Sequence, residues 1–145
     1  MKQIFREKRK LDFSTYDLSV PTFKLYSIEG GQYDFTDNLG FPDNQDGVYI
    51  FLTSKPALDM EKMDITPMCT LWYCGKTVDL RHRFDQHHHK DELKEFNPLY
   101  IAVAYCDNEQ EITKVENDLL SFFLFPYNEA ANKGTNKDTI KAVRI

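Results

Sequence analysis

The chain has 145 residues, with 23 Asp and Glu against 18 Lys and Arg, giving a formal net charge of −5. This length corresponds to about one domain, and a hydrophobic fraction of 41% supports one modest core rather than two. The acidic balance excludes a protein that binds polyanions over its whole surface, and no apolar run approaches the roughly 20 residues that span a bilayer.

The N-terminal half predicts β-structure. Residues 22–28 and 32–35 are short runs with aromatic and β-branched residues on either side of two glycines, and they predict a hairpin. The stretch 34–46 is rich in Asp, Asn, Gly and Pro and predicts a loop. The apolar run GVYIFL at 47–52 then predicts a central strand.

A second central strand is predicted at 70–74, where the sequence reads TLWYC. The connection before it, residues 53–69, contains two prolines and three methionines and is long for a hairpin. A helix is expected next, with Thr77 or Asp79 as its N-cap. The run LYIAVAYC at 99–106 is the third and most apolar predicted strand.

A second helix is predicted from about residue 108 to 125, because apolar residues recur there at helical spacing. Pro126 is expected to end it, since the residue before a proline is pushed out of the α region. The tail after Asn128 is polar until residues 140–145, which are expected to add a short terminal element.

Charge is distributed unevenly along the chain. Residues 1–10 carry +4, residues 11–75 carry −7 and residues 76–145 carry −2. Contact with nucleic acid must therefore use a local patch, and the two candidates are the N-terminus and the stretch 76–90. The N-terminus has no apolar run behind its bases, and the three cysteines include no CxxC pair, so we expect no secretory signal, reduced thiols and a cytoplasmic location.

Two groups of polar residues stand on or beside apolar helix faces. Glu116 lies four positions after Ile112, so it needs a cation, a hydrogen-bond network or a place at the rim where it reaches water. Arg83 and His87 share a helix face at i and i+4. This spacing suits a functional pair and equally a surface contact on an amphipathic helix, and spacing alone does not decide between them.

Three further candidates lie in or next to the predicted strands. Tyr49 and Tyr73 each occupy an apolar run close to a glycine, and a buried phenol needs a hydrogen-bond partner whether its role is structural or catalytic. Lys76 directly follows Gly75 at the end of a strand, where a lysine can contact a phosphate but is also common without one.

Taken in order, these residues resemble the GIY-YIG nuclease superfamily. The resemblance rests on GVY at 47–49, YCG at 73–75, an arginine eight residues beyond that glycine, a glutamate on a helix and an asparagine shortly after a proline. It spans roughly residues 46–130, with YCGKTVDLRHRFDQHH and VENDLLSFFLFPYN as the most similar segments.

The resemblance implies a phosphodiesterase site. Tyr49 would be the general base or would orient the attacking water, and Tyr73 would hydrogen-bond the phosphate or the water. Arg83 would hold the scissile phosphate and stabilise its developing charge, a task that suits a planar, permanently charged guanidinium. His87 would assist proton movement, and Lys76 matches a lysine that some members carry after the glycine.

The same resemblance implies a metal and a supporting set. Glu116 would be the single protein ligand of Mg²⁺ or Mn²⁺. One carboxylate is enough for magnesium, because this ion keeps several water ligands. Asn128 would support the site by hydrogen bonding, together with Gly47 and Gly75. Lys76 and two further basic residues, Arg81 and Lys90, would also contact the DNA.

The sequence departs from the family pattern in three places. Val48 and Cys74 stand where isoleucine is usual, and both suit a buried strand position. The connection 53–69 is longer than usual, so an insertion that forms a lid or a partner surface is expected. The first 40 residues have no counterpart in the family.

The resulting prediction is an α/β (α+β) domain with a central, mainly antiparallel three-stranded sheet flanked by helices. Residues 46–145 would form this nuclease-like domain, and residues 1–45 an N-terminal extension packed on or beside it. The expected function is divalent-metal-dependent hydrolysis of DNA phosphodiester bonds. The alternative is a catalytically silent binding module, or a subunit of a larger nucleic-acid-processing assembly with a protein partner; neither involves a membrane.

Overall fold

The computed structural model describes residues 9–29, 32–34, 46–61, 63–77, 92, 95, 99–128 and 132–145. Within these residues it contains seven strands and one helix. They are β1 (Arg9–Leu11), β2 (Lys24–Glu29), β3 (Gln32–Asp34), β4 (Gly47–Asp59), β5 (Asp64–Thr77), β6 (Leu99–Tyr105), α3 (Glu109–Phe122) and β7 (Ile140–Arg144).

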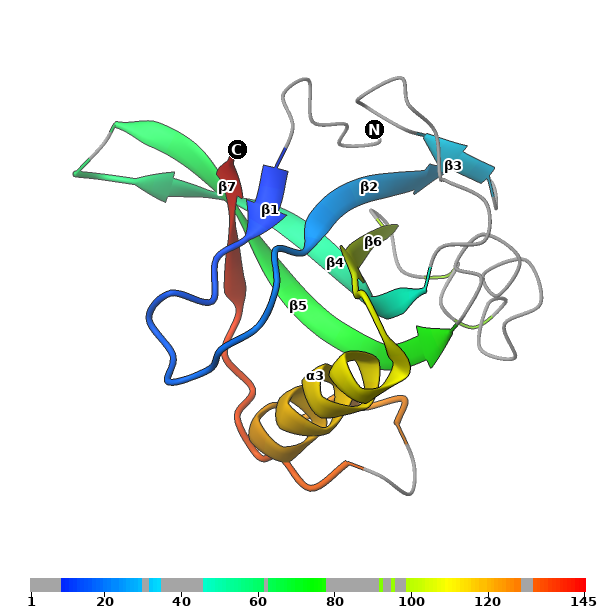
Figure 1. Ribbon diagram of the computed structural model, residues 1–145. Helices are drawn as coiled ribbons and strands as arrows, with labels where there is room; N and C mark the ends of the chain where they lie inside the picture. Colours follow the sequence, from blue (N-terminus) through cyan, green and yellow to red (C-terminus); the bar gives the residue numbers. More distant parts are fainter. Residues whose placement is uncertain are drawn as a thin grey trace.

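The strands form a closed antiparallel barrel. They lie in the order β1-β7-β5-β4-β6-β2-β3, and β1 also pairs with β2, so the first six strands of this order close on themselves. β3 adds to β2 from outside that ring. Figure 1 shows the strands curving around a common centre, with α3 packed below β4 and β5.

The predicted three-stranded sheet flanked by helices is therefore wrong. The three predicted central strands are neighbours, in the order β5-β4-β6, but they make up only half of a closed ring. The remaining strands, β1, β2 and β7, are short and come from the two ends of the chain, which meet where Leu11 pairs with Ala142. Closure removes the sheet edges that a three-stranded sheet would leave exposed.

Several local predictions are confirmed. The predicted hairpin runs 22–28 and 32–35 match the paired strands β2 and β3, with β2 one residue longer at its end, and the terminal run contains β7. The strands predicted at 47–52 and 70–74 exist but are longer than expected, because most of the connection 53–69 continues them as a ladder that ends at the Asp59–Asp64 pair. The helix predicted after residue 76 lies outside the described residues.

Alternation along the strands separates two apolar clusters. The inner cluster fills the barrel and joins it to α3; its members from the middle of the sheet include Val48, Ile50, Cys74 and Ala102. The outer cluster lies on the opposite face of β2, β4 and β6 and consists of Tyr26, Tyr49, Phe51, Ile101 and Val103. All residues of both clusters are buried.

The helix α3 begins as predicted and ends earlier. Asn108 is its N-cap, and its side chain accepts a hydrogen bond from the Glu111 N–H at 2.8 Å. The helix stops at Phe122 rather than at Pro126, because the Asn132 amide donates to the carbonyls of Leu120 and Phe123 at 2.9 and 2.8 Å. The backbone N–H groups of Lys133 and Gly134 also donate to the Leu120 carbonyl, at 3.0 and 2.8 Å, so the segment that follows Asn132 satisfies the end of the helix.

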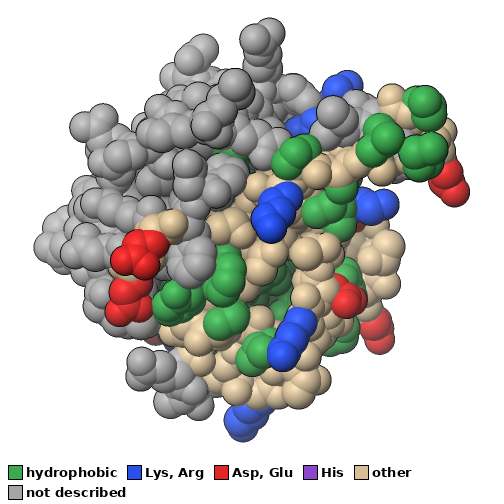
Figure 2. Space-filling view, turned by 180° about the vertical axis from the view of Figure 1, so that it is seen from behind, with side chains coloured by type: hydrophobic (Ala, Val, Ile, Leu, Met, Phe, Trp, Pro, Cys, Tyr) green, Lys and Arg blue, Asp and Glu red, His purple; other side chains and the backbone are tan. Residues whose placement is uncertain are grey.

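The outer half of the β4–β5 hairpin projects from the barrel. β6 pairs with β4 only as far as Thr53, and β7 meets β5 only at Met68 and Cys69. Figure 1 shows this ribbon extending beyond the other strands, and Figure 2 shows hydrophobic and acidic side chains at its end. Its exposed hydrophobic residues are 60 to 75% accessible to solvent; they are Leu58, Met60 and Met63.

Candidate active site

The two tyrosine motifs meet across adjacent strands. Tyr49 pairs directly with Gly75, so the last residue of GVY lies opposite the last residue of YCG. A Cβ atom on Gly75 would lie 2.5 Å from both the Cζ and the Oη atoms of Tyr49. Only a residue without a side chain leaves room for this ring, which explains why the second motif ends in glycine.

Tyr73 lies on the same face as Tyr49. The two rings stack with their centroids 6.2 Å apart at an interplanar angle of 27°, and the Phe51 ring lies 6.2 Å from Tyr73. Tyr49 is 2% exposed, whereas Tyr73 is half-buried. The structure therefore brings Tyr49, Tyr73 and Gly75 together on the outer cluster, as one packed aromatic unit.

Lys76 and Glu116 come together on the opposite face. Lys76 pairs with Val48 of the inner cluster, and its Nζ donates to Thr113 Oγ1 of α3 at 3.3 Å. Glu116 is half-buried one turn further along the same helix. Burial raises the pKa of the Glu116 carboxyl, and the positive charge of Lys76 opposes that shift.

The strand register thus divides the predicted site between two faces. Opposed residues of an antiparallel pair share a face, so Tyr49 with Gly75 and Val48 with Lys76 point in opposite directions. Both pairs nevertheless lie within two positions of the last pair of the ribbon, Gly47 with Thr77.

Asn128 acts at the edge of β5. Its Oδ1 accepts from the Cys74 N–H at 2.8 Å, and its Nδ2 donates to the Cys74 carbonyl at 2.7 Å. The neighbouring Tyr127 N–H donates to the Trp72 carbonyl at 3.0 Å. The segment after Pro126 therefore takes the place of a neighbouring strand, and Asn128 fixes the backbone immediately before Gly75 and Lys76.

Cys74 is part of the core. It is 1% exposed and pairs with Ile50 on the inner face. Burial raises the pKa of its thiol well above the usual value, and the Glu116 carboxylate raises it further. A thiol that resists ionisation is a poor nucleophile and a poor metal ligand.

Four of the predicted site residues lie outside the described residues. Arg83 and His87, which the resemblance assigns to phosphate binding and proton movement, are in this group, as are the predicted DNA contacts Arg81 and Lys90. Gly47 lies within the described residues, where it is buried at the start of β4 and pairs with Thr77 and Tyr105.

Thr113 is a site residue that the sequence reasoning missed. It lies three positions before Glu116 and contacts Lys76 from the same side of α3. The i, i+3 spacing from Glu116 was available in the sequence as a signal. The partner Lys76 was not, because it comes from a different element.

The described side chains supply few metal ligands. No group of three or more His, Cys, Asp or Glu side chains able to hold a metal ion occurs among them. Glu116 is one carboxylate among the described side chains, and the charge that acts on it is that of the Lys76 ammonium. No helix among the described residues is both long and apolar enough to cross a membrane.

No protein-family model, curated protein or solved structure matches the chain.

Proposed function

We propose that the chain is a divalent-metal-dependent endonuclease that hydrolyses DNA phosphodiester bonds at the open end of the β4–β5 ribbon. The observation that carries this proposal is the half-buried Glu116 carboxylate beside the Lys76 ammonium. Lys76 comes seven residues before Arg83 in the sequence. A carboxylate kept in a partly apolar position is costly, and such groups concentrate at functional sites.

The chemistry assigned to this end of the ribbon is phosphoryl transfer to water. Arg83 binds the scissile phosphate through its planar guanidinium, and Lys76 adds a second positive charge on the α3 side. Tyr49 is buried on the face opposite Glu116, so it acts as a positioning residue through its packing against Gly75, and His87 assists the proton transfer from the attacking water. Glu116 would hold Mg²⁺ or Mn²⁺, which would stabilise the negative charge that develops on the phosphate.

Two contacts support a positioned rather than an incidental arrangement. The Asn128 side chain holds both backbone polar groups of Cys74, which sets the place of Gly75 and Lys76. Gly75 in turn leaves the space that the Tyr49 ring occupies. Catalytic groups held by such packing and hydrogen bonding keep their geometry between substrate encounters.

Nicking of supercoiled and branched DNA in magnesium tests the proposal. Wild type is compared with Arg83→Ala, Glu116→Gln and Lys76→Ala, and the matched control is Glu109→Gln, an exposed carboxylate in the first turn of the same helix. We expect loss of at least about a hundredfold in rate for Arg83→Ala and Glu116→Gln, and no loss for the control. Equal nicking by all five proteins would refute the assignment.

A catalytically silent binding module is the second candidate. It is favoured by the register, which places Tyr49 and Glu116 on opposite faces of the ribbon. A module of this kind would bind DNA equally well in EDTA and in magnesium and would show no nicking with any metal. Measuring binding and nicking on the same preparation separates the two candidates.

A further inference from the structure

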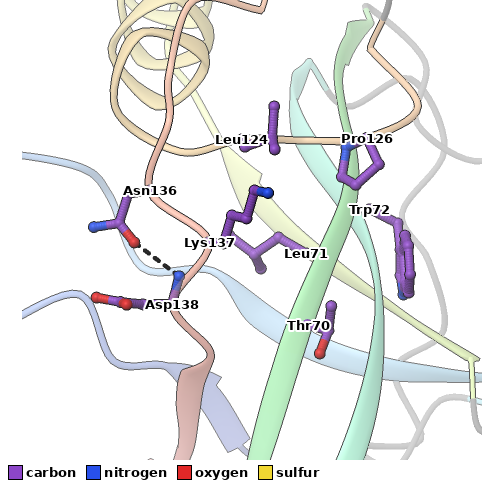
Figure 3. A pocket seen from close by; sticks show the side chains of 8 residues that line it. All are labelled: Thr70, Leu71, Trp72, Leu124, Pro126, Asn136, Lys137 and Asp138. Carbon is purple, nitrogen blue, oxygen red and sulfur yellow. Dashed lines mark hydrogen bonds between the residues drawn. The ribbon is translucent and has the colours of Figure 1, made fainter.

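A cavity of about 390 Å³ opens at the edge of β5, where β7 diverges from it. Residues 70–72 of β5 form one wall and residues 136–138 the other, with Leu124 and Pro126 between them (Figure 3). The cavity is apolar over most of its lining and lies within the size range of small-ligand sites.

Trp72 is held in a defined position at this cavity. A register shift places it between the Leu52–Leu71 and Phe51–Tyr73 pairs of the β4–β5 ladder. Its indole N–H donates to Thr53 Oγ1 at 3.1 Å, and the Tyr127 ring lies 5.9 Å away at 62°. The side chain is half-buried, so part of this oriented aromatic ring remains accessible at the surface.

Positive charge lies on both sides of Trp72. Lys137 is exposed, and Figure 3 shows its side chain extending from the far wall of the cavity towards β5. Lys55 is also exposed, two residues after Thr53 on β4 and hence on the same face as the Thr53 hydroxyl that binds the indole. One carboxylate also lines the cavity, that of Asp138, whose Oδ2 accepts a hydrogen bond from the Tyr16 hydroxyl at 3.3 Å.

We propose that this place binds one unpaired nucleotide of a DNA strand, with its base against the Trp72 indole and its flanking phosphates near Lys137 and Lys55. The proposal rests on the proposed nuclease function in naming DNA as the ligand, and it deepens that function by naming an unpaired base. A base within a duplex is already stacked on both faces and cannot reach an indole at a strand edge. An unpaired base has a π-face that stacks on an aromatic side chain whatever its sequence.

Phosphate contacts combined with base stacking explain how a chain of net negative charge could bind DNA. A net charge of −5 opposes binding of a duplex over the whole surface, so contact with DNA must use local positive charges such as those near Trp72. Stacking is less sensitive to salt than phosphate contact, so an aromatic site compensates for the few available cations. The substrate expected from this arrangement is a single-stranded, gapped or branched DNA.

Trp72 is the single tryptophan of the chain, so its fluorescence reports on this place directly. The full chain in EDTA is titrated with four ligands: a single-stranded oligothymidine, the same strand with abasic sites, a duplex of equal length and an oligouridine. We expect saturable quenching by oligothymidine, with at least about fivefold weaker binding of the abasic strand and of the duplex. Oligouridine shows whether the site distinguishes DNA from RNA.

Variants separate the contribution of base stacking from that of positive charge. Their binding is measured by the fluorescence anisotropy of a labelled oligothymidine, because this signal does not depend on the Trp72 indole. Trp72→Ala should weaken binding at least about fivefold while Trp72→Phe keeps most of it. Lys137→Ala should weaken binding and reduce its salt dependence, whereas the control Lys133→Ala, an exposed lysine four positions earlier, should do neither.

Equal affinity for the abasic and the normal strand, or wild-type affinity of Trp72→Ala with an unchanged far-ultraviolet spectrum, would overturn the proposal. EDTA keeps this experiment independent of cleavage. Base-dependent quenching in a protein that never nicks DNA would retain the nucleotide site and reject the nuclease. Nicking without base-dependent binding would do the reverse.

Discussion

Tyr49 and Gly75 are interdependent: the phenol ring of Tyr49 fills the space in which any side chain on Gly75 would begin. The two residues form a cross-strand pair of the β4–β5 ladder, and the hypothetical Gly75 Cβ lies 2.5 Å from the tyrosine Oη. Because Tyr49 is buried among Phe51, Tyr73 and Val103, its ring has little room to move aside. Two motifs that lie apart in the sequence are thus one packing unit.

Gly75→Ala should destabilise the fold by about 1–3 kcal/mol, because it forces the Tyr49 ring from its packed position. The free energy of unfolding from urea denaturation measures this cost. The matched experiment is the same substitution in a Tyr49→Ala background, where the ring is gone. We expect the cost of Gly75→Ala to fall there to within about 0.5 kcal/mol of zero; an equal cost in both backgrounds would place the strain elsewhere.

Asn128→Ala should destabilise by about 1–3 kcal/mol, since it removes both hydrogen bonds to the Cys74 backbone at once. Asn128→Asp keeps an acceptor for the Cys74 N–H but has no donor for the carbonyl, so we expect a partial loss that grows on ionisation. Urea denaturation compares both variants with Asn117→Ala, an exposed asparagine on α3. If Asn128→Ala unfolds at the wild-type midpoint, the Asn128 contacts do not stabilise β5.

The raised pKa of Glu116 makes stability depend on pH. Burial is the main cause of the shift above the usual value of 4.5, and Lys76 partly opposes it. The folded state therefore holds this proton more tightly than the unfolded state, so the associated stability is present at low pH and is lost as pH rises through the folded pKa. Glu116→Gln removes the titration and should gain stability relative to wild type between about pH 4 and pH 7.

Denaturation curves of wild type and Glu116→Gln across that pH range measure the difference, with Glu109→Gln as the exposed control. A difference that stays constant with pH would show that Glu116 titrates as it does in the unfolded chain. Metal binding through the Glu116 carboxylate should change with pH in the opposite direction, strengthening as the group ionises.

Thiol reactivity should follow burial rather than position in a motif. Burial raises the pKa of Cys69 to about 12 and that of Cys74 well above its usual value, and both side chains are almost fully enclosed. Partial burial and the Glu111 and Asp107 carboxylates raise the pKa of Cys106 to about 11, but its side chain is only half-buried, so a disulfide reagent should modify it first. Fast native-state modification of Cys74 would contradict its place in the core. A Cys106→Ser variant removes the fast thiol, so that the slow modification of Cys69 and Cys74 can be measured.

The sequence determined the local structure well. The runs at 47–52 and 99–106 are apolar and bounded by turn residues, which is typical of buried strands. Asn108 and Glu111 supply the N-terminal capping contacts of α3 from residues within one turn, so the start of that helix was predictable. Its end was not, because the groups that bind its last carbonyls belong to Asn132, Lys133 and Gly134, which come after Pro126 in the sequence.

The tertiary structure alone decided the closure of the barrel and the division of the site between two faces. β1, β2 and β7 are short and gain stability mainly from pairing with one another and with the central strands, which no local pattern records. The register of β4 against β5 sets which side chains meet, and a slip of one residue would place Tyr49 and Lys76 on the same face. That register depends on packing summed over the whole sheet, including the irregularity at Trp72, and it is therefore a property of the fold rather than of either motif.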